Sequence, residues 1–138
     1  MALLLILTAA FSFKSINGLE LNYDDERYIT HNELIKDLDA GKVKQIFSTY
    51  FDGHYHPLTL LSLGMDNLLF QNAIKGHHVV NWLLHLANAL LVYLFILALF
   101  KDQALAFGTA LLFALHPMTV ESYAWMTERK NVLYSFFF

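Results

Sequence analysis

One uncharged hydrophobic run constrains the fold more than any other feature of this sequence. Between Val79 and Phe100 there is no Asp, Glu, Lys or Arg. A helix of about 20 predominantly apolar residues crosses the hydrocarbon core of a bilayer, and this run reaches that length. The composition agrees, since 57% of the residues are hydrophobic and 15% are charged, against about 25% charged in an average soluble domain. The run therefore predicts a transmembrane helix.

Further apolar segments predict an all-α, multipass membrane protein. A second run begins at Ala104, directly after the polar pair Lys101-Asp102, and so predicts a helical hairpin that returns through the membrane. Both ends of the chain are apolar and resemble spans that have been cut short. We therefore interpret the chain as the N-terminal fragment of a larger protein, with juxtamembrane helices in its long outer loop. The expected spans lie near 1–14, 79–100, 104–120 and 131–138, and the outer loop covers 15–78.

The count of turns places two polar segments on the same side of the membrane. If the first span leaves the cytoplasm, residues 14–78 and 118–131 both lie outside, and Lys101-Asp102 lies inside. In the long loop, Thr30 and Glu33 have the spacing of a capping box, which predicts a helix that ends at Gly41. A second helix is expected at Leu58–Phe70, too short to span and lying against the membrane surface or against the other helices.

An acidic cluster follows the first apolar run. Asp24, Asp25 and Glu26 are adjacent, so their charges repel and favour protonation of some of them. A carboxylate at a membrane exit can serve as a general base. The alternative is a solvated cluster that holds a juxtamembrane turn in water, and the spacing alone favours this alternative.

Two histidines in the loop before Pro57 form a second candidate site. The residue before a proline is driven towards extended geometry, in which alternate side chains point the same way. His54 and His56 can therefore share a ligand such as a divalent metal ion or a phosphate. The alternative is a pair of polar loop histidines without a ligand.

The long hydrophobic run carries a polar stripe. Asn81, His85 and Asn88 fall on one helical face. Polar groups inside a membrane face a bundle interior or a wet cavity. One interpretation is that these side chains form hydrogen bonds between helices, which we prefer for Asn88. The other is that they form part of a site, which suits Asn81 and His85 better because they lie closer to the long loop.

The second outer segment offers both acids and cations. His116 and Pro117 open it, and Pro117 suits the first turn of a helix. On such a helix Glu121, Trp125 and Glu128 share one face. Arg129 and Lys130 then lie at its far end, where they either hold a lipid phosphate through charge-assisted hydrogen bonds or snorkel towards water.

Several classes of function are excluded by composition. The chain has no cysteine, so a disulfide framework, a thiolate metal site and a cysteine nucleophile are impossible within it. The formal net charge is −3 and no basic block is present, which argues against a nucleic-acid partner.

Four strings in this order resemble a known family of membrane enzymes: YDDERYITHN, FSTYFDGHYHPLTLLSLGMD, GHHVVNWLLHLANALLVYLF and LLFALHPMTVESYAWMTERKNVL. They are similar to the N-terminal part of GT-C glycosyltransferases. The greatest likeness is to the membrane proteins with C-terminal tetratricopeptide repeats that are related to the protein O-mannosyltransferases.

The resemblance implies a sugar donor carried on a polyprenyl phosphate. It implies transfer with inversion to an acceptor, such as a protein hydroxyl or a glycan, on the extracytoplasmic face of the bacterial inner membrane or the endoplasmic reticulum. The catalytic carboxylate is expected in the pair Asp24 and Asp25, with Asp24, which follows Tyr23, as the first choice. The residues expected to bind the substrate or the lipid phosphate are His54, His56, His116, Glu121, Arg129 and Lys130.

Two alternative functions, from classes other than the glycosyltransferases, stay open. One is a non-catalytic membrane subunit whose polar stripe binds partner helices. The other is a transporter, which is less favoured because no span shows paired intramembrane charges.

Overall fold

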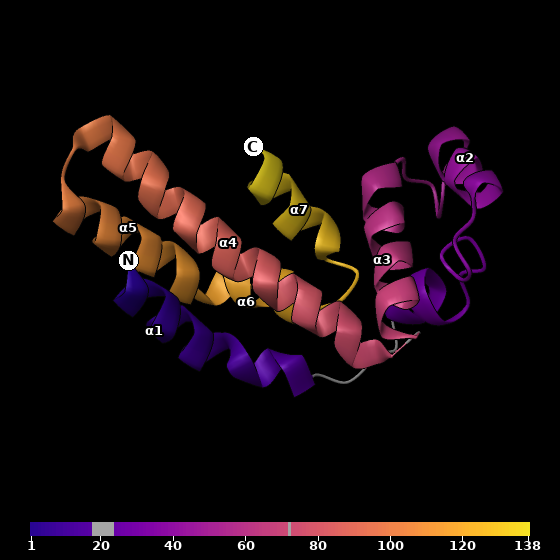
Figure 1. The fold of residues 1–138 in the computed structure, drawn as a ribbon, viewed down its shortest axis with the longest axis horizontal. Coiled ribbons are helices and arrows are strands. Elements are labelled where there is room, and N and C mark those ends of the chain that lie inside the picture. Colours follow the sequence, from indigo (N-terminus) through magenta and orange to yellow (C-terminus); the bar gives the residue numbers. More distant parts are fainter. Residues whose placement is uncertain (18–23, 72) are drawn as a thin grey trace.

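The computed structural model describes residues 1–17, 24–71 and 73–138, and these residues form helices and no named strand (Figure 1). The elements are α1 (Ala2–Ser12), η1 (Phe13–Asn17), η2 (Glu26–Thr30), α2 (Ala40–Ser48), α3 (Pro57–Phe70), α4 (Ile74–Phe100), α5 (Gln103–Leu115), α6 (Pro117–Ala124) and α7 (Arg129–Phe137). The helix α4 runs along most of the molecule, with α1 and α5 beside it and α2 and α3 gathered at one end.

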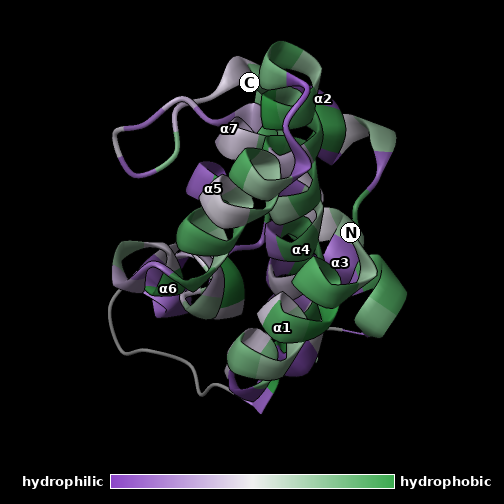
Figure 2. Cartoon of the chain, turned by 90° about the vertical axis from the view of Figure 1, so that its left-hand side faces the viewer, coloured by the Kyte–Doolittle hydropathy of each residue, from purple (hydrophilic) through white to green (hydrophobic). Residues whose placement is uncertain are grey.

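Within the described residues, α4 is the one helix long and apolar enough to cross a membrane by itself. Only 22% of its most apolar window is buried inside the chain, so α4 is not an enclosed core helix. Much of α1 and α4 is hydrophobic in Figure 2. The span predicted at 104–120 is not one straight helix. Instead, α5 and α6 meet at a bend of 60° and reach the length of a span only as a pair.

The chain ends are helical, as predicted, but short. The apolar helix at the N-terminal end covers Ala2–Asn17, and α7 covers nine residues. Neither reaches the length of a span by itself.

The predicted hairpin between the two hydrophobic runs is present. Lys101 ends α4 in the left-handed conformation, with φ of 57°, and the Asp102 side chain accepts hydrogen bonds from the N–H groups of Ala104 and Leu105. Three buried alanines then recur along α5 at helical spacing, at Ala106, Ala110 and Ala114. Small side chains let helix backbones approach closely, so this stripe brings α5 against its neighbours.

The polar stripe of α4 binds backbone carbonyls of the broken segment that follows it. Asn81 donates to the carbonyls of Trp125 and Met126, just beyond the end of α6. His85 Nε2 donates to the Ala114 carbonyl at 3.1 Å, where α5 ends before Pro117. Apolar surroundings offer no water to carbonyls that a helix break sets free, so these side chains stabilise the break.

Asn88 donates to the Val132 carbonyl at 2.9 Å. The expectation of interhelical hydrogen bonding is therefore met for Asn88. Asn81 and His85 serve the same structural purpose rather than facing an open site.

The prediction of a helix that begins at the capping box of Thr30 and Glu33 is wrong. The Asn32 side chain donates to the Tyr28 carbonyl and accepts from the Leu34 N–H, and this local turn competes with helix formation. The helix α2 instead begins after Asp39, whose carboxylate accepts from the Lys42 N–H at 2.7 Å. Consequently Gly41, expected to end a helix, lies in its first turn.

The second helix of the outer loop is confirmed as α3, which begins at Pro57. It packs into a small core that draws on distant parts of the chain. The buried members of this core are Tyr28, Ile29, Ile35, Ile46, Leu60, Leu63 and Met126. The core thus ties the outer loop to the segment between α6 and α7.

Candidate functional site

A polar cavity lies where the two predicted outer segments meet. Its volume is about 300 Å³. The long loop and α3 contribute Asp24, Tyr28, His54, Tyr55, His56 and Thr59, and the segment after α6 contributes Thr127 and Lys130. Four of the residues expected at a site from the sequence are therefore brought together: Asp24, His54, His56 and Lys130.

A tight hairpin presents His54 to the cavity. Asp52 and Gly53 have φ of 49° and 80°, and Phe51 and His54 exchange two backbone hydrogen bonds of 2.9 Å. Positive φ at both central residues is the requirement of a type I′ turn, for which Asp-Gly is a preferred sequence. Arg27 pairs with Asp52 at 3.1 Å and so joins the turn to η2.

The two histidines lie near each other, as the spacing predicted. The ring centroids of His54 and His56 are 6.0 Å apart, and Tyr28 stacks on His56 at 5.4 Å. Burial lowers the pKa of His56, and the nearby His54 and Lys130 lower it further, against an opposing effect of Asp52. His56 Nε2 is buried and has no hydrogen-bond partner among the described residues, so the hydrogen-bonding capacity of this atom is unused there.

The adjacent carboxylates have different surroundings. Asp24 lines the cavity. Asp25 is fully buried, and its Oδ1 accepts a hydrogen bond from the Thr127 N–H at 3.1 Å. Tyr23, the aromatic residue before them, lies outside the described residues.

The segment that follows α6 supplies a hydroxyl and a cation. Thr127 is 5% exposed, and its Oγ1 has no partner within the described part of the chain. Lys130 is half exposed and pairs with Glu128 at 3.0 Å. Its ammonium is therefore accessible from the cavity, with one carboxylate competing for it.

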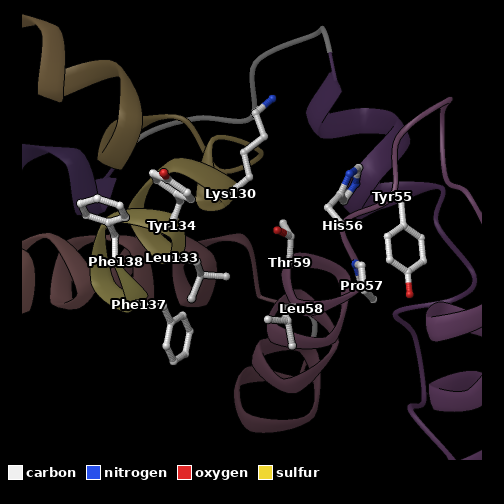
Figure 3. A pocket seen from close by; sticks show the side chains of 10 residues that line it. All are labelled: Tyr55, His56, Pro57, Leu58, Thr59, Lys130, Leu133, Tyr134, Phe137 and Phe138. Atoms are coloured by element: carbon white, nitrogen blue, oxygen red, sulfur yellow. The ribbon is translucent and has the colours of Figure 1, made fainter.

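A larger, mostly apolar groove adjoins the polar cavity. Its volume is about 530 Å³, and it shares Tyr55, His56, Thr59 and Lys130 with that cavity. Beyond these shared residues the walls come from the start of α3 and from α7: Pro57, Leu58, Leu133, Tyr134, Phe137 and Phe138. Figure 3 shows His56 and Lys130 towards one end of the groove, and Leu58 and Phe137 towards the other.

The structure places the other expected site residues elsewhere. Arg129 is completely buried and is bonded to Asp66 at 2.6 Å, so it does not line the cavity. His116 caps α6 by accepting the Met118 N–H. Glu121 is exposed on α6, and the expected face shared with Trp125 and Glu128 does not form, because α6 ends at Ala124.

The described residues do not fit a metal ion. No three His, Asp or Glu side chains in ranges 1–17, 24–71 and 73–138 come together as a ligand set. His54 and His56 therefore lack a third such ligand from the described chain, and we derive no step through a metal.

Sequence reasoning missed Tyr28, Tyr55, Thr59 and Thr127 as cavity residues. Thr59 follows Pro57 in the first turn of a correctly predicted helix, so helical geometry offers a signal for it. No local signal identifies Tyr28 or Thr127, because their place depends on the packing of Met126 against the outer loop.

The chain is similar to several proteins named as O-mannosyl-transferases. It is 28% identical over 98% of its length to protein O-mannosyl-transferase F38B6.6 of Caenorhabditis elegans, of which it covers 21%. It is 40% identical over 57% of its length to protein O-mannosyl-transferase TMTC1 of Mus musculus, covering 8% of that protein. It is 33% identical over 84% of its length to protein O-mannosyl-transferase TMTC3 of Mus musculus, covering 13%.

The chain therefore spans about a fifth or less of the length of these curated relatives. No family model matches the chain. No solved structure matches it either. The similarity to proteins named as O-mannosyl-transferases thus extends over nearly all of this chain and a small part of theirs.

Proposed function

We propose that this chain is the donor-binding part of a membrane glycosyltransferase. The enzyme transfers a sugar from a polyprenyl-phosphate carrier to an acceptor hydroxyl, with inversion at the sugar. The names of the relatives support glycosyl transfer in general and make mannose the first sugar to test, with a protein hydroxyl as its acceptor.

The observation that carries this proposal is the joining of the polar cavity to the apolar groove. A polyprenyl phosphate has a compact anionic head and a long apolar tail. Lys130, His56 and Thr59 line both spaces, so they suit the head, and the apolar walls of α3 and α7 suit the tail. Burial of apolar area favours tail binding by about 25 cal/mol per Å².

The chemistry follows from the two sides of the polar cavity. The acceptor oxygen attacks the anomeric carbon of the donor, and the bond from that carbon to the phosphate oxygen breaks. Asp24 takes the proton that the hydroxyl loses. The bond electrons leave with the phosphate, whose charge Lys130 stabilises together with hydrogen bonds from Thr127 and the histidines.

The proposed arrangement in the membrane is multipass and integral. In it α4 spans the bilayer, α5 and α6 form a broken return, and the ends of the chain contribute to further spans. Both segments that line the cavity fall on one side in the turn count, and with a first span that leaves the cytoplasm this side is the extracytoplasmic face. Activity requires the longer protein of which we propose this chain is a part.

The alternative of a non-catalytic subunit is less supported. That reading needs the polar stripe of α4 to bind partner helices. In the structure Asn81, His85 and Asn88 each donate to a carbonyl of this same chain, so these donors are already engaged.

The test is a transfer assay with the full-length protein in detergent or vesicles. Radiolabelled mannose is supplied either on a polyprenyl phosphate or as a nucleotide sugar, together with a protein acceptor. We expect label on the acceptor only with the lipid-linked donor. Transfer from the nucleotide sugar in a lipid-free preparation, or no transfer from either donor, would contradict the proposal.

A further inference from the structure

One buried guanidinium joins three helices beside the polar cavity. Arg129 has no exposed surface. Its Nη2 donates to Asp66 Oδ2 at 2.6 Å and to the His77 carbonyl at 2.9 Å. Its Nη1 donates to Ser62 Oγ at 2.7 Å, and its Nε donates to Asn81. The first residue of α7 is thus fixed to both α3 and α4.

The acceptor carboxylate is also held from a second side. Asp66 is 3% exposed, and its Oδ2 accepts from His77 Nδ1 at 3.0 Å. His77 Nε2 lies 3.0 Å from Asn67 Oδ1, and the Asn67 amide donates to the Ile35 carbonyl. The carboxylate therefore has little freedom to follow Arg129 if that side chain moves.

This network lies directly behind the cavity wall. Lys130 is the residue next to Arg129, and Thr127 is two residues before it. On α3, Thr59 in the wall is one helical turn before Ser62 in the network. A shift of the first turn of α7 would therefore move the Lys130 ammonium relative to His56 and Thr59, whereas Thr127 lies before α7 and is held by its own bond to Asp25.

We propose that Arg129 and Asp66 are positioning residues that act through Lys130. The inference rests on the proposed function, because a donor phosphate is the group that Lys130 binds. A short helix such as α7 has little stability of its own. A buried ion pair contributes little net stability, yet separating its partners is costly, so it favours one arrangement over others.

Arginine suits this purpose better than lysine. The planar guanidinium directs its donors to Ser62, Asp66 and Asn81 at once, which a single ammonium cannot reproduce. Arg129→Lys keeps the charge but loses this geometry. We expect the donor KM to rise about tenfold, since misplacement by about 1 Å costs up to a hundredfold in well-oriented sites.

The experiment is a double-mutant cycle in the full-length protein with a polyprenyl-phosphate sugar donor. It compares wild type, Arg129→Lys, Lys130→Met and the double variant, with folding checked by thermal unfolding. If Arg129 acts through Lys130, the double variant has the donor KM of Lys130→Met alone. If the two effects multiply, Arg129 acts independently of Lys130 and the positioning role is overturned.

A milder variant covers the case in which Arg129→Lys does not fold. Ser62→Ala removes one bond to the guanidinium and leaves the ion pair, and Ser48→Ala on the exposed end of α2 is its control. We expect Ser62→Ala to raise the donor KM severalfold in wild type and not at all in Lys130→Met. A rise in both backgrounds overturns the inference.

The same measurements distinguish failure of the proposed function from failure of the positioning role. If Lys130→Met leaves the donor KM unchanged while the protein transfers sugar, Lys130 does not bind the donor, and positioning through it is overturned as well. If Lys130→Met raises the KM and the cycle is multiplicative, the proposed function stands and only the positioning role falls.

Discussion

The carboxylate of Asp25 accepts a hydrogen bond from the backbone N–H of Thr127, which lies 102 residues further along the chain. This contact fixes the segment after α6 against the acidic cluster of the outer loop. Its neighbour Asp24 is left to line the polar cavity. Two adjacent carboxylates thus have different surroundings, and the separate tasks proposed for them can be distinguished by mutation.

Asp24→Asn should abolish most transfer without unfolding the protein. The substitution keeps size and shape but removes the proposed base, so we expect a loss of about 10²–10⁴ in kcat. The measurement is transfer at saturating donor. Asp37→Asn, the same change at an exposed turn outside the cavity, is the matched control. Near-normal transfer in Asp24→Asn would remove this residue from the mechanism.

Asp25→Ala should lower stability. It leaves the buried N–H of Thr127 without this acceptor, at a cost of roughly 1–3 kcal/mol. We expect a lower midpoint of thermal unfolding in detergent for Asp25→Ala and little change for Asp24→Ala. Equal midpoints for the two variants would contradict the separation of their tasks.

Removing His56 should make the protein less sensitive to acid. Its pKa is lowered in the folded state, so below the ordinary value of about 6.5 the unfolded chain binds a proton there that the folded chain resists. Stability is then lost as the pH falls from about 7.5 towards about 5.5. The unfolding midpoint of His56→Gln should fall less than that of wild type over this range. An equal fall in both proteins would contradict the linkage.

Glu128→Gln should tighten donor binding. The Glu128 carboxylate pairs with the Lys130 ammonium at 3.0 Å and competes with a phosphate for it. Exposed pairs contribute about 0.2–1 kcal/mol, so we expect the donor KM to fall up to about fivefold. Glu33→Gln breaks a comparable pair with Lys36, at 2.8 Å, away from the cavity. A higher KM in Glu128→Gln, or the same fall in Glu33→Gln, would count against this competition.

The proposed membrane arrangement predicts a labelling pattern. The chain contains no cysteine, so single cysteines placed in it are unique within these residues. Lys44→Cys and Glu121→Cys should react with an impermeant thiol reagent from one side of sealed vesicles, and Lys101→Cys from the other. Labelling of positions 44 and 121 from opposite sides would contradict a single cavity formed by both segments.

Local patterns predicted the elements that depend on local chemistry. The end of α4 at Phe100, the polar turn at Lys101-Asp102 and the helix at Leu58–Phe70 follow from hydropathy and turn residues. The start of α4 does not, because the helix begins at Ile74, before the uncharged run that starts at Val79. The helix expected after Thr30 failed because Asn32 forms a competing turn and Asp39 provides the actual N-cap. Its apolar residues nevertheless reach the core, as Ile35 does with full burial.

The candidate site could be predicted only in part, because residue type does not show which side chains the fold brings together. Residue type identified Asp24, His54, His56 and Lys130, which the fold brings to one cavity. Residue type also suggested Arg129, whose guanidinium is turned inward because Asp66 provides a buried carboxylate from α3. Such a partner lies 63 residues away, and nothing in the spacing of Arg129 and Lys130 indicates which of the two faces the cavity.

The broken segment of α5 and α6 has a consequence for biosynthesis. Neither half is long enough to be recognised as a span, and the carbonyls at its breaks find donors on Asn81 and His85 of α4. These donors are synthesised first and leave the ribosome ahead of the segment that needs them. In the proposed membrane arrangement, insertion of α5 and α6 therefore depends on prior insertion of α4, and a defect at His85 should appear as failed integration of the segment formed by α5 and α6.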